Sequence, residues 1–82
     1  MNPAEKILVR MRGTKHGWGY EDLKHLYLGF GFEIDEGGKH ALFIHPKYPQ
    51  LRATVGRHRS LAVGYVQYAI RTIDELQKLE VN

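Results

Sequence analysis

Two short segments with strand-like patterns, separated by a pair of glycines, constrain the fold more than any other feature of the chain. Apolar and acidic residues alternate over 32–35, which is the period-two pattern of a half-buried strand. The glycines at 37–38 favour a tight turn, and 39–45 is expected to form the returning strand. A third short strand is expected over 51–55, after a turn bracketed by two prolines. The sequence therefore predicts a three-stranded antiparallel meander.

Helical periodicity flanks these strands. Apolar residues recur three and four positions apart over 4–12 and 20–29. Ser60 is the expected N-cap of a closing helix. The predicted fold class is α+β, with the order α-β-β-β-α over 20–82 and an extra short N-terminal helix and loop over 1–19. Helices on one face of such a sheet leave the other face open, and we expect this open face, lined by basic residues, to be the functional surface.

The 82 residues include no cysteine, which excludes disulfides, zinc ribbons and thiol nucleophiles. The longest uninterrupted apolar run, 41–44, is far shorter than the roughly 20 residues that a membrane span needs. Residues 1–8 lack the apolar stretch of a signal peptide. We therefore expect one small, soluble, cytoplasmic domain with no membrane partner.

The net charge of +3 is the sum of three unequal segments. Residues 1–36 carry five basic and six acidic side chains, and residues 74–82 carry one basic and three acidic ones. The segment between them, 37–73, carries six basic side chains and no acid. Such a segment favours an anionic partner such as nucleic acid. The alternative is a chance segregation of charge on a solvated face.

Three of the five histidines, His40, His45 and His58, lie in this acid-free segment. Their spacings match no familiar ligand pattern, and no acid or cysteine lies near them in sequence, so no metal or cofactor is predicted. His40 begins the second predicted strand, where its ring can act as a general base or acid. A structural, hydrogen-bonded histidine is the alternative, and apolar residues on both strand faces leave open which face is buried.

His58 lies between Arg57 and Arg59, just before the predicted closing helix. Two guanidiniums and the backbone N–H groups of a helix N-terminus favour a bound phosphate. A solvated basic loop is the alternative explanation of the same residues.

The segment Gly-Lys-His-Ala-Leu-Phe at 38–43, followed by His-Pro at 45–46, resembles a motif of HicA-type toxins from prokaryotic toxin–antitoxin systems. The resemblance extends over 20–75, with Tyr-Glu-Asp-Leu at 20–23 and Gly-Phe-Glu at 31–33 also similar to that family. One departure is Lys39, where the family more often has serine. The segment 1–19 lies outside the resemblance.

The resemblance implies a fold like the double-stranded RNA-binding domain and cleavage of mRNA without metal or cofactor. It also implies inhibition by a HicB-like antitoxin and a catalytic role for His40. Such cleavage needs a base for the 2′-hydroxyl and cations around the phosphate. We assign the RNA and phosphate contacts to Lys39, Arg57, His58 and Arg59. The sequence does not identify the general acid; His58 is a better candidate than His45, because strand alternation places His45 on the opposite face from His40.

Two other functions fit the same residues. The first is a non-catalytic RNA-binding module of the same fold, which would bind RNA in a salt-sensitive way without cleaving it. The second is a protein-interaction domain whose basic face binds an acidic partner.

Overall fold

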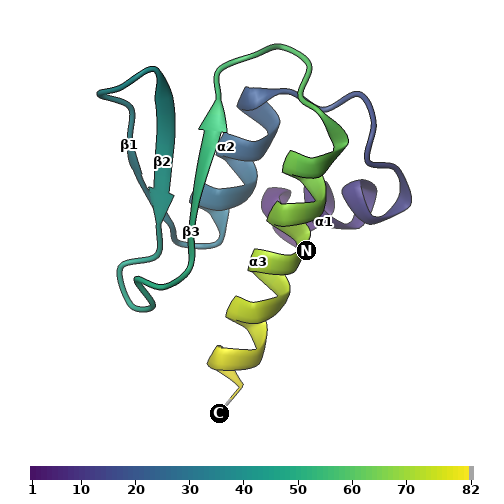
Figure 1. Ribbon diagram of the computed structural model, residues 1–82. Coiled ribbons are helices and arrows are strands. Elements are labelled where there is room, and N and C mark those ends of the chain that lie inside the picture. The colour runs from purple at the N-terminus through teal and green to yellow at the C-terminus, as the bar shows by residue number, and fades with distance from the viewer. Residues whose placement is uncertain (82) are drawn as a thin grey trace.

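The computed structural model describes residues 1–81 and contains one three-stranded sheet and three helices (Figure 1). The elements are α1 (Pro3–Gly13), α2 (Tyr20–Gly29), β1 (Glu33–Asp35), β2 (His40–Ile44), β3 (Arg52–Gly56) and α3 (Val63–Glu80). The sheet is antiparallel with the order β1-β2-β3. The predicted α+β class, the α-β-β-β-α order and the extra N-terminal helix are therefore confirmed. Among the described residues, no helix combines the length and hydropathy needed to cross a bilayer.

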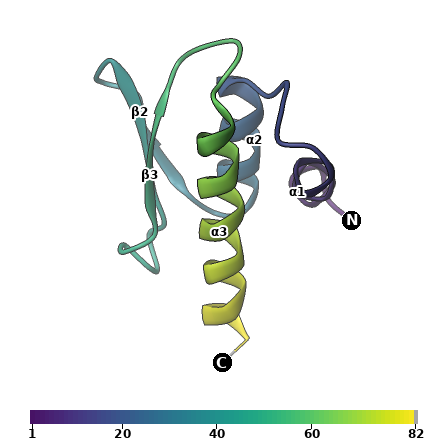
Figure 2. The ribbon, with the colours of Figure 1, turned by 45° about the vertical axis from the view of Figure 1, so that its right-hand side comes forward.

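The molecule is built in layers, with the sheet on one side, α2 and α3 behind it, and α1 farthest from the sheet (Figure 2). Residues of β2 alternate between the two sheet faces. Ala41 and Phe43 are fully buried toward the helices, and Phe43 stacks on Tyr27 with ring centroids 4.9 Å apart. His40 is exposed on the opposite face, with Leu42 half-buried there. Packing against the helices thus settles which face of β2 is buried.

The N-terminal helix α1 packs into the same core as the rest of the chain. Its start is fixed by a capping box, in which the Asn2 side chain accepts from the Glu5 N–H at 2.8 Å and Glu5 accepts from the Asn2 N–H at 3.0 Å. Leu8 and Met11 join the buried cluster formed by α2, α3 and the sheet. The segment 1–19 is therefore packed onto 20–81, and its treatment as a separate unit stays a prediction.

The closing helix begins later than the sequence predicts. Ser60 is not its N-cap; α3 starts at Val63, and the N-cap residue Ala62 makes no side-chain capping bond. The cause is tertiary, because the Leu61 N–H donates to the Trp18 carbonyl at 2.8 Å and the Leu61 side chain is buried. This hydrogen bond and the burial of the side chain hold Leu61 in a non-helical conformation. The strand β1 begins one residue later than predicted, and β2 and β3 each differ from their predicted ranges by one residue at both ends.

Candidate functional site

His40 is the first residue of β2 and lies opposite Gly56, the last residue of β3. Its side chain is exposed on the open face of the sheet. Because Gly56 has no side chain, the His40 ring can lie over it. The His40 Cδ2 atom is 3.5 Å from the position that a β-carbon at residue 56 would take.

His58 lies two residues beyond Gly56 and its ring approaches the same point. Its Cδ2 and Nε2 atoms are 2.9 and 3.1 Å from the position of that β-carbon. The two imidazoles, which we call the histidine pair, therefore converge above Gly56. The structure thus brings together His40, the expected catalytic residue, and His58, the better candidate for the acid, from segments 18 residues apart in sequence.

The backbone of the loop that carries His58 is held against the start of α2. The Tyr20 N–H donates to the His58 carbonyl at 2.8 Å. A β-carbon on Gly19 would lie 2.1 Å from the Arg59 carbonyl oxygen, so only glycine permits this approach. A cleft of about 310 Å³ lies here, lined by Gly19, Tyr20, Glu21, Arg57, His58 and Arg59. The His58 backbone is therefore fixed by tertiary hydrogen bonding as well as by its position after β3.

Arg57 joins this loop to the tip of the β1–β2 hairpin. Its guanidinium donates to the Gly38 carbonyl at 2.7 Å and also to the Glu36 carbonyl. Two of its five N–H donors are thus used by backbone oxygens, which do not neutralise its charge. Arg57 therefore fixes the hairpin that carries His40 relative to the loop that carries His58, and it keeps a positive charge at the site.

Lys39 and Arg59 are both exposed, and neither forms an ion pair with an acid in the part of the chain that the structure describes. Lys39 precedes His40 on the hairpin, and Arg59 follows His58 in the loop. All five residues predicted for catalysis or phosphate binding therefore gather around one end of the β2–β3 ladder. Their arrangement places three cations around two imidazoles, which suits an anionic ligand.

Three residues to which the sequence assigns no role in the reaction also border this end of the sheet. The Tyr20 hydroxyl donates to the Glu36 carboxylate, and the Lys24 Nζ atom lies 3.4 Å from the same carboxylate. The hydrogen bond from Tyr20, followed by Lys24, lowers the pKa of Glu36. Burial, with a further contribution from Glu36, raises the pKa of Tyr20. These residues lie on α2 and at the hairpin tip, and no sequence spacing connects them.

His45 has a different role from the other two histidines of the acid-free segment. It lies on the helix side of the sheet, as strand alternation predicts, and is 6% exposed. Its ring packs edge-on against Phe32, with centroids 5.1 Å apart, and its Nδ1 atom accepts from the Lys47 N–H at 3.2 Å. His45 is therefore a packed, hydrogen-bonded histidine in the turn that follows β2.

The helix end that borders residues 57–59 belongs to α2, whereas the sequence argument expects the closing helix there. The α2 end is already compensated, because Glu21 and Asp22 lie in its first turn and Asp22 accepts from the Gly19 N–H at 2.8 Å. The positive charge of the site therefore comes from side chains, without a free helix N-terminus.

Within residues 1–81, no three His, Asp or Glu side chains cluster in a way that would hold a metal ion. Comparisons of the chain with models of known protein families, with curated proteins and with solved structures gave no match. The site is thus described by its own geometry: two exposed imidazoles that converge over a glycine, surrounded by three cationic side chains.

Proposed function

We propose that this protein is a HicA-like endoribonuclease, the toxin of a toxin–antitoxin system, which cleaves mRNA with His40 as its catalytic histidine. The observation that carries the proposal is the convergence of His40 and His58 above Gly56. Two neighbouring imidazoles can supply both a base and an acid to one reaction. The motif around His40 and the cations Lys39, Arg57 and Arg59 support the same conclusion.

In the proposed reaction, neutral His40 removes the proton from a ribose 2′-hydroxyl. The 2′-oxygen attacks the adjacent phosphorus, and the bond from phosphorus to the 5′-oxygen breaks. Protonated His58 gives its proton to the departing 5′-oxygen, so the products are a 2′,3′-cyclic phosphate and a 5′-hydroxyl end. General acid–base catalysis of this kind contributes about 10²- to 10⁴-fold.

The cationic side chains have a separate task in this reaction. Lys39, Arg57 and Arg59 hold the phosphate and stabilise the charge that grows on its oxygens during attack. Lys39 is adjacent to His40, and Arg57 and Arg59 are adjacent to His58, so each imidazole has a cation beside it in sequence. The proposal assigns no step to a metal ion or a cofactor.

The test is cleavage of single-stranded RNA by the purified protein in the presence of EDTA. The wild type is compared with His40→Ala, His58→Ala and, as a matched control, His25→Ala, an exposed histidine on α2 that lies outside the site. We expect the control to cleave like the wild type and each site variant to lose about 10²-fold or more. Equal cleavage by wild type and His40→Ala, or none by either, would contradict the proposal.

A non-catalytic RNA-binding module is the second candidate, and the exposed cations Lys39 and Arg59 favour it as much as they favour a nuclease. This function predicts RNA binding that weakens with salt and survives His40→Ala, without cleavage products. The nuclease proposal also names a protein partner, a HicB-like antitoxin, and a cytoplasmic location where mRNA is present. An acidic partner would suit the basic residues of the site.

A further inference from the structure

The outer edge of β3 presents backbone groups that have no strand partner. The His45 N–H donates to the Leu51 carbonyl at 3.1 Å, so the register places the backbone groups of the exposed residues Arg52 and Thr54 on the outer edge, pointing away from β2. The Tyr68 hydroxyl donates to the Arg52 carbonyl at 2.8 Å, which confirms that this carbonyl points away from β2. Within residues 1–81, no hydrogen bond reaches the outward N–H and C=O of Thr54.

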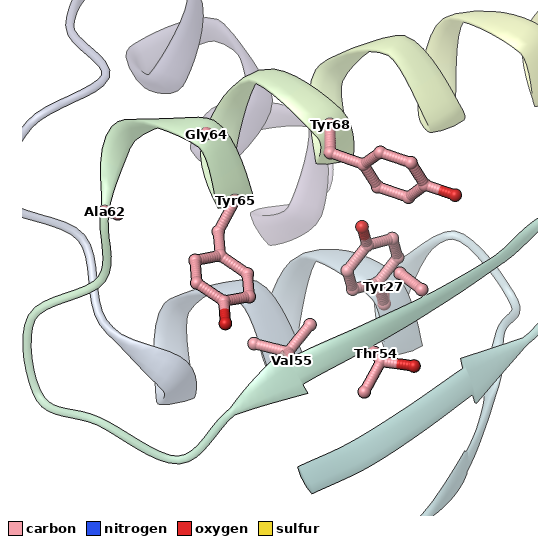
Figure 3. Close-up of a pocket in the computed structure, with 8 residues that line it drawn as sticks. Tyr27, Thr54, Val55, Ala62, Gly64, Tyr65 and Tyr68 are labelled. Carbon is pink, nitrogen blue, oxygen red and sulfur yellow. The ribbon is translucent and has the colours of Figure 1, made fainter.

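An apolar groove of about 400 Å³ runs beside this edge, between β3 and α3. Figure 3 shows Tyr65 and Tyr68 of α3 and Tyr27 of α2 gathered on the helix side of the strand. The Tyr27 side chain is fully buried, and its hydroxyl has no hydrogen-bond partner among the described residues. Burial raises the pKa of Tyr27, whereas the Thr72 hydroxyl, which itself donates to the Tyr68 carbonyl at 2.8 Å, lowers it. The groove thus has mainly apolar walls and borders the Tyr27 hydroxyl, which has no hydrogen-bond partner among the described residues.

The charges around the groove favour an acidic occupant. Ala62, the N-cap of α3, borders the groove without capping the helix, and the first turn of α3 contains no acid. The positive end of this helix is therefore left without a compensating carboxylate. Arg52 is exposed at the other end of β3, and the whole segment 37–73 carries no acid.

The two edges of the sheet differ in their suitability for pairing with another strand. The edge strand β1 has three residues, and Glu33 and Asp35 are both exposed on it. Short length and exposed charge are the usual protections of an edge strand against pairing. The edge strand β3 has five residues, of which only Arg52 is charged, and it contains no proline. Of the two edges of the described sheet, β3 is therefore the longer and less charged strand, and it borders the groove between β3 and α3.

We propose that the edge of β3 binds an extended, acidic segment of another protein as a fourth strand of the sheet. The backbone of that segment pairs with Thr54, and every second side chain is apolar and enters the groove against Tyr65 and Tyr68. Its acidic side chains lie near Arg52 and the N-terminus of α3. This proposal stands independently of the proposed nuclease activity, because the groove contains neither His40 nor His58.

The probe is a synthetic peptide of about seven residues in which valine and glutamate alternate, which is slightly longer than an average strand. Binding is followed by NMR hydrogen exchange and by titration. We expect the amide of Thr54 to gain protection when the peptide binds. A peptide of the same sequence with N-methylated backbone positions loses strand donors and is expected to bind about tenfold more weakly or worse.

Gly64 provides a matched pair of variants for the groove itself. It lines the groove, and a β-carbon added there would meet nothing within 4 Å. Gly64→Ala is therefore expected to bind the peptide like the wild type. Gly64→Trp places a large ring at the groove and is expected to weaken binding about tenfold, the loss of one good contact. The N-methylated peptide provides an independent test on the wild-type protein if the tryptophan variant fails to fold.

Several outcomes would overturn the proposal. These are equal affinity for the N-methylated peptide, protection at β1 instead of β3, or no binding at all. Protection of Thr54 by single-stranded RNA in preference to the peptide would assign the groove to nucleic acid. Protection of Thr54 in the free protein, together with self-association in sedimentation, would assign it to a second copy of the chain. RNA cleavage is measured separately, so failure of the docking proposal is distinguishable from failure of the nuclease proposal.

Discussion

Replacing Gly56 with alanine separates the effect of the histidine pair on activity from its effect on stability. The added β-carbon would lie 2.9 Å from Cδ2 and 3.1 Å from Nε2 of His58, but 3.5 Å from Cδ2 of His40. The first two distances are too short for van der Waals contact, and the third is ordinary contact. The substitution is therefore expected to displace the His58 ring and leave His40 in place.

The cost to stability is small because the group that must move is an exposed side chain. Gly56 does not have a positive φ, so alanine fits its backbone. Replacing glycine by alanine at a compatible position stabilises by about 0.4–1 kcal/mol through the unfolded state. Moving the His58 ring to a poorer rotamer costs about 0.5–1.5 kcal/mol. The two terms nearly cancel, and we expect the free energy of unfolding to change by less than about 1 kcal/mol.

Cleavage of single-stranded RNA by Gly56→Ala should nevertheless fall about 10²-fold or more, because the proposed acid is moved away from the proposed base. The control is Gly64→Ala, a second glycine-to-alanine change with open space around the new β-carbon. Unfolding is measured in urea on both variants. Wild-type cleavage by a folded Gly56→Ala protein would refute the joint role of the two histidines, and a large loss of stability would refute the energetic reasoning.

Three further changes test other parts of the structure. Gly19→Ala places a β-carbon 2.1 Å from the Arg59 carbonyl oxygen and should cost about 3 kcal/mol in urea unfolding, because backbone must move. Met11→Ala empties a fully buried site between α1 and the core and should cost about 2–5 kcal/mol in the same assay. Tyr20→Phe removes the main cause of the lowered Glu36 pKa. Glu36 stabilises the fold above its unfolded-state pKa and loses that effect as pH falls through its folded-state pKa. An NMR titration of Tyr20→Phe should therefore show a higher Glu36 pKa, and its stability should depend less on acid pH.

The elements of the fold could be predicted because their signals are local. Alternation over 32–35, the paired glycines at 37–38 and the helical spacing over 20–29 each act within a few residues. The start of α3 could not be predicted, because it depends on a hydrogen bond from Leu61 to Trp18, which is 43 residues away. A good N-cap residue at position 60 is overridden by that distant contact.

In the candidate site too, the local motifs could be predicted from the sequence, whereas the contacts between distant segments could not. The motif around His40 and the two arginines that flank His58 are visible in the sequence. Their convergence over Gly56 depends on the register of β2 with β3, which local patterns leave open. The second role of Arg57, bonded to the hairpin tip, depends on the same register. No sequence signal marked Gly56, although its missing side chain is what lets the two rings approach.

An acid-free segment of sequence is not the same as a uniformly basic surface. The open face of the sheet includes β1, and Glu33 and Asp35 of β1 pair with Ile44 and Leu42 of β2 on that face. Basic residues therefore do not line the whole open face. Its positive side chains are concentrated where β2 begins and β3 ends, at Lys39 and in the loop 57–59. A polynucleotide lying across β1 would meet two carboxylates, whereas one at the histidine pair meets three cations near Glu21 and Glu36, the latter bound by Tyr20 and Lys24. Charge thus directs an anionic ligand to the end of the sheet that carries His40 and His58, and away from its middle.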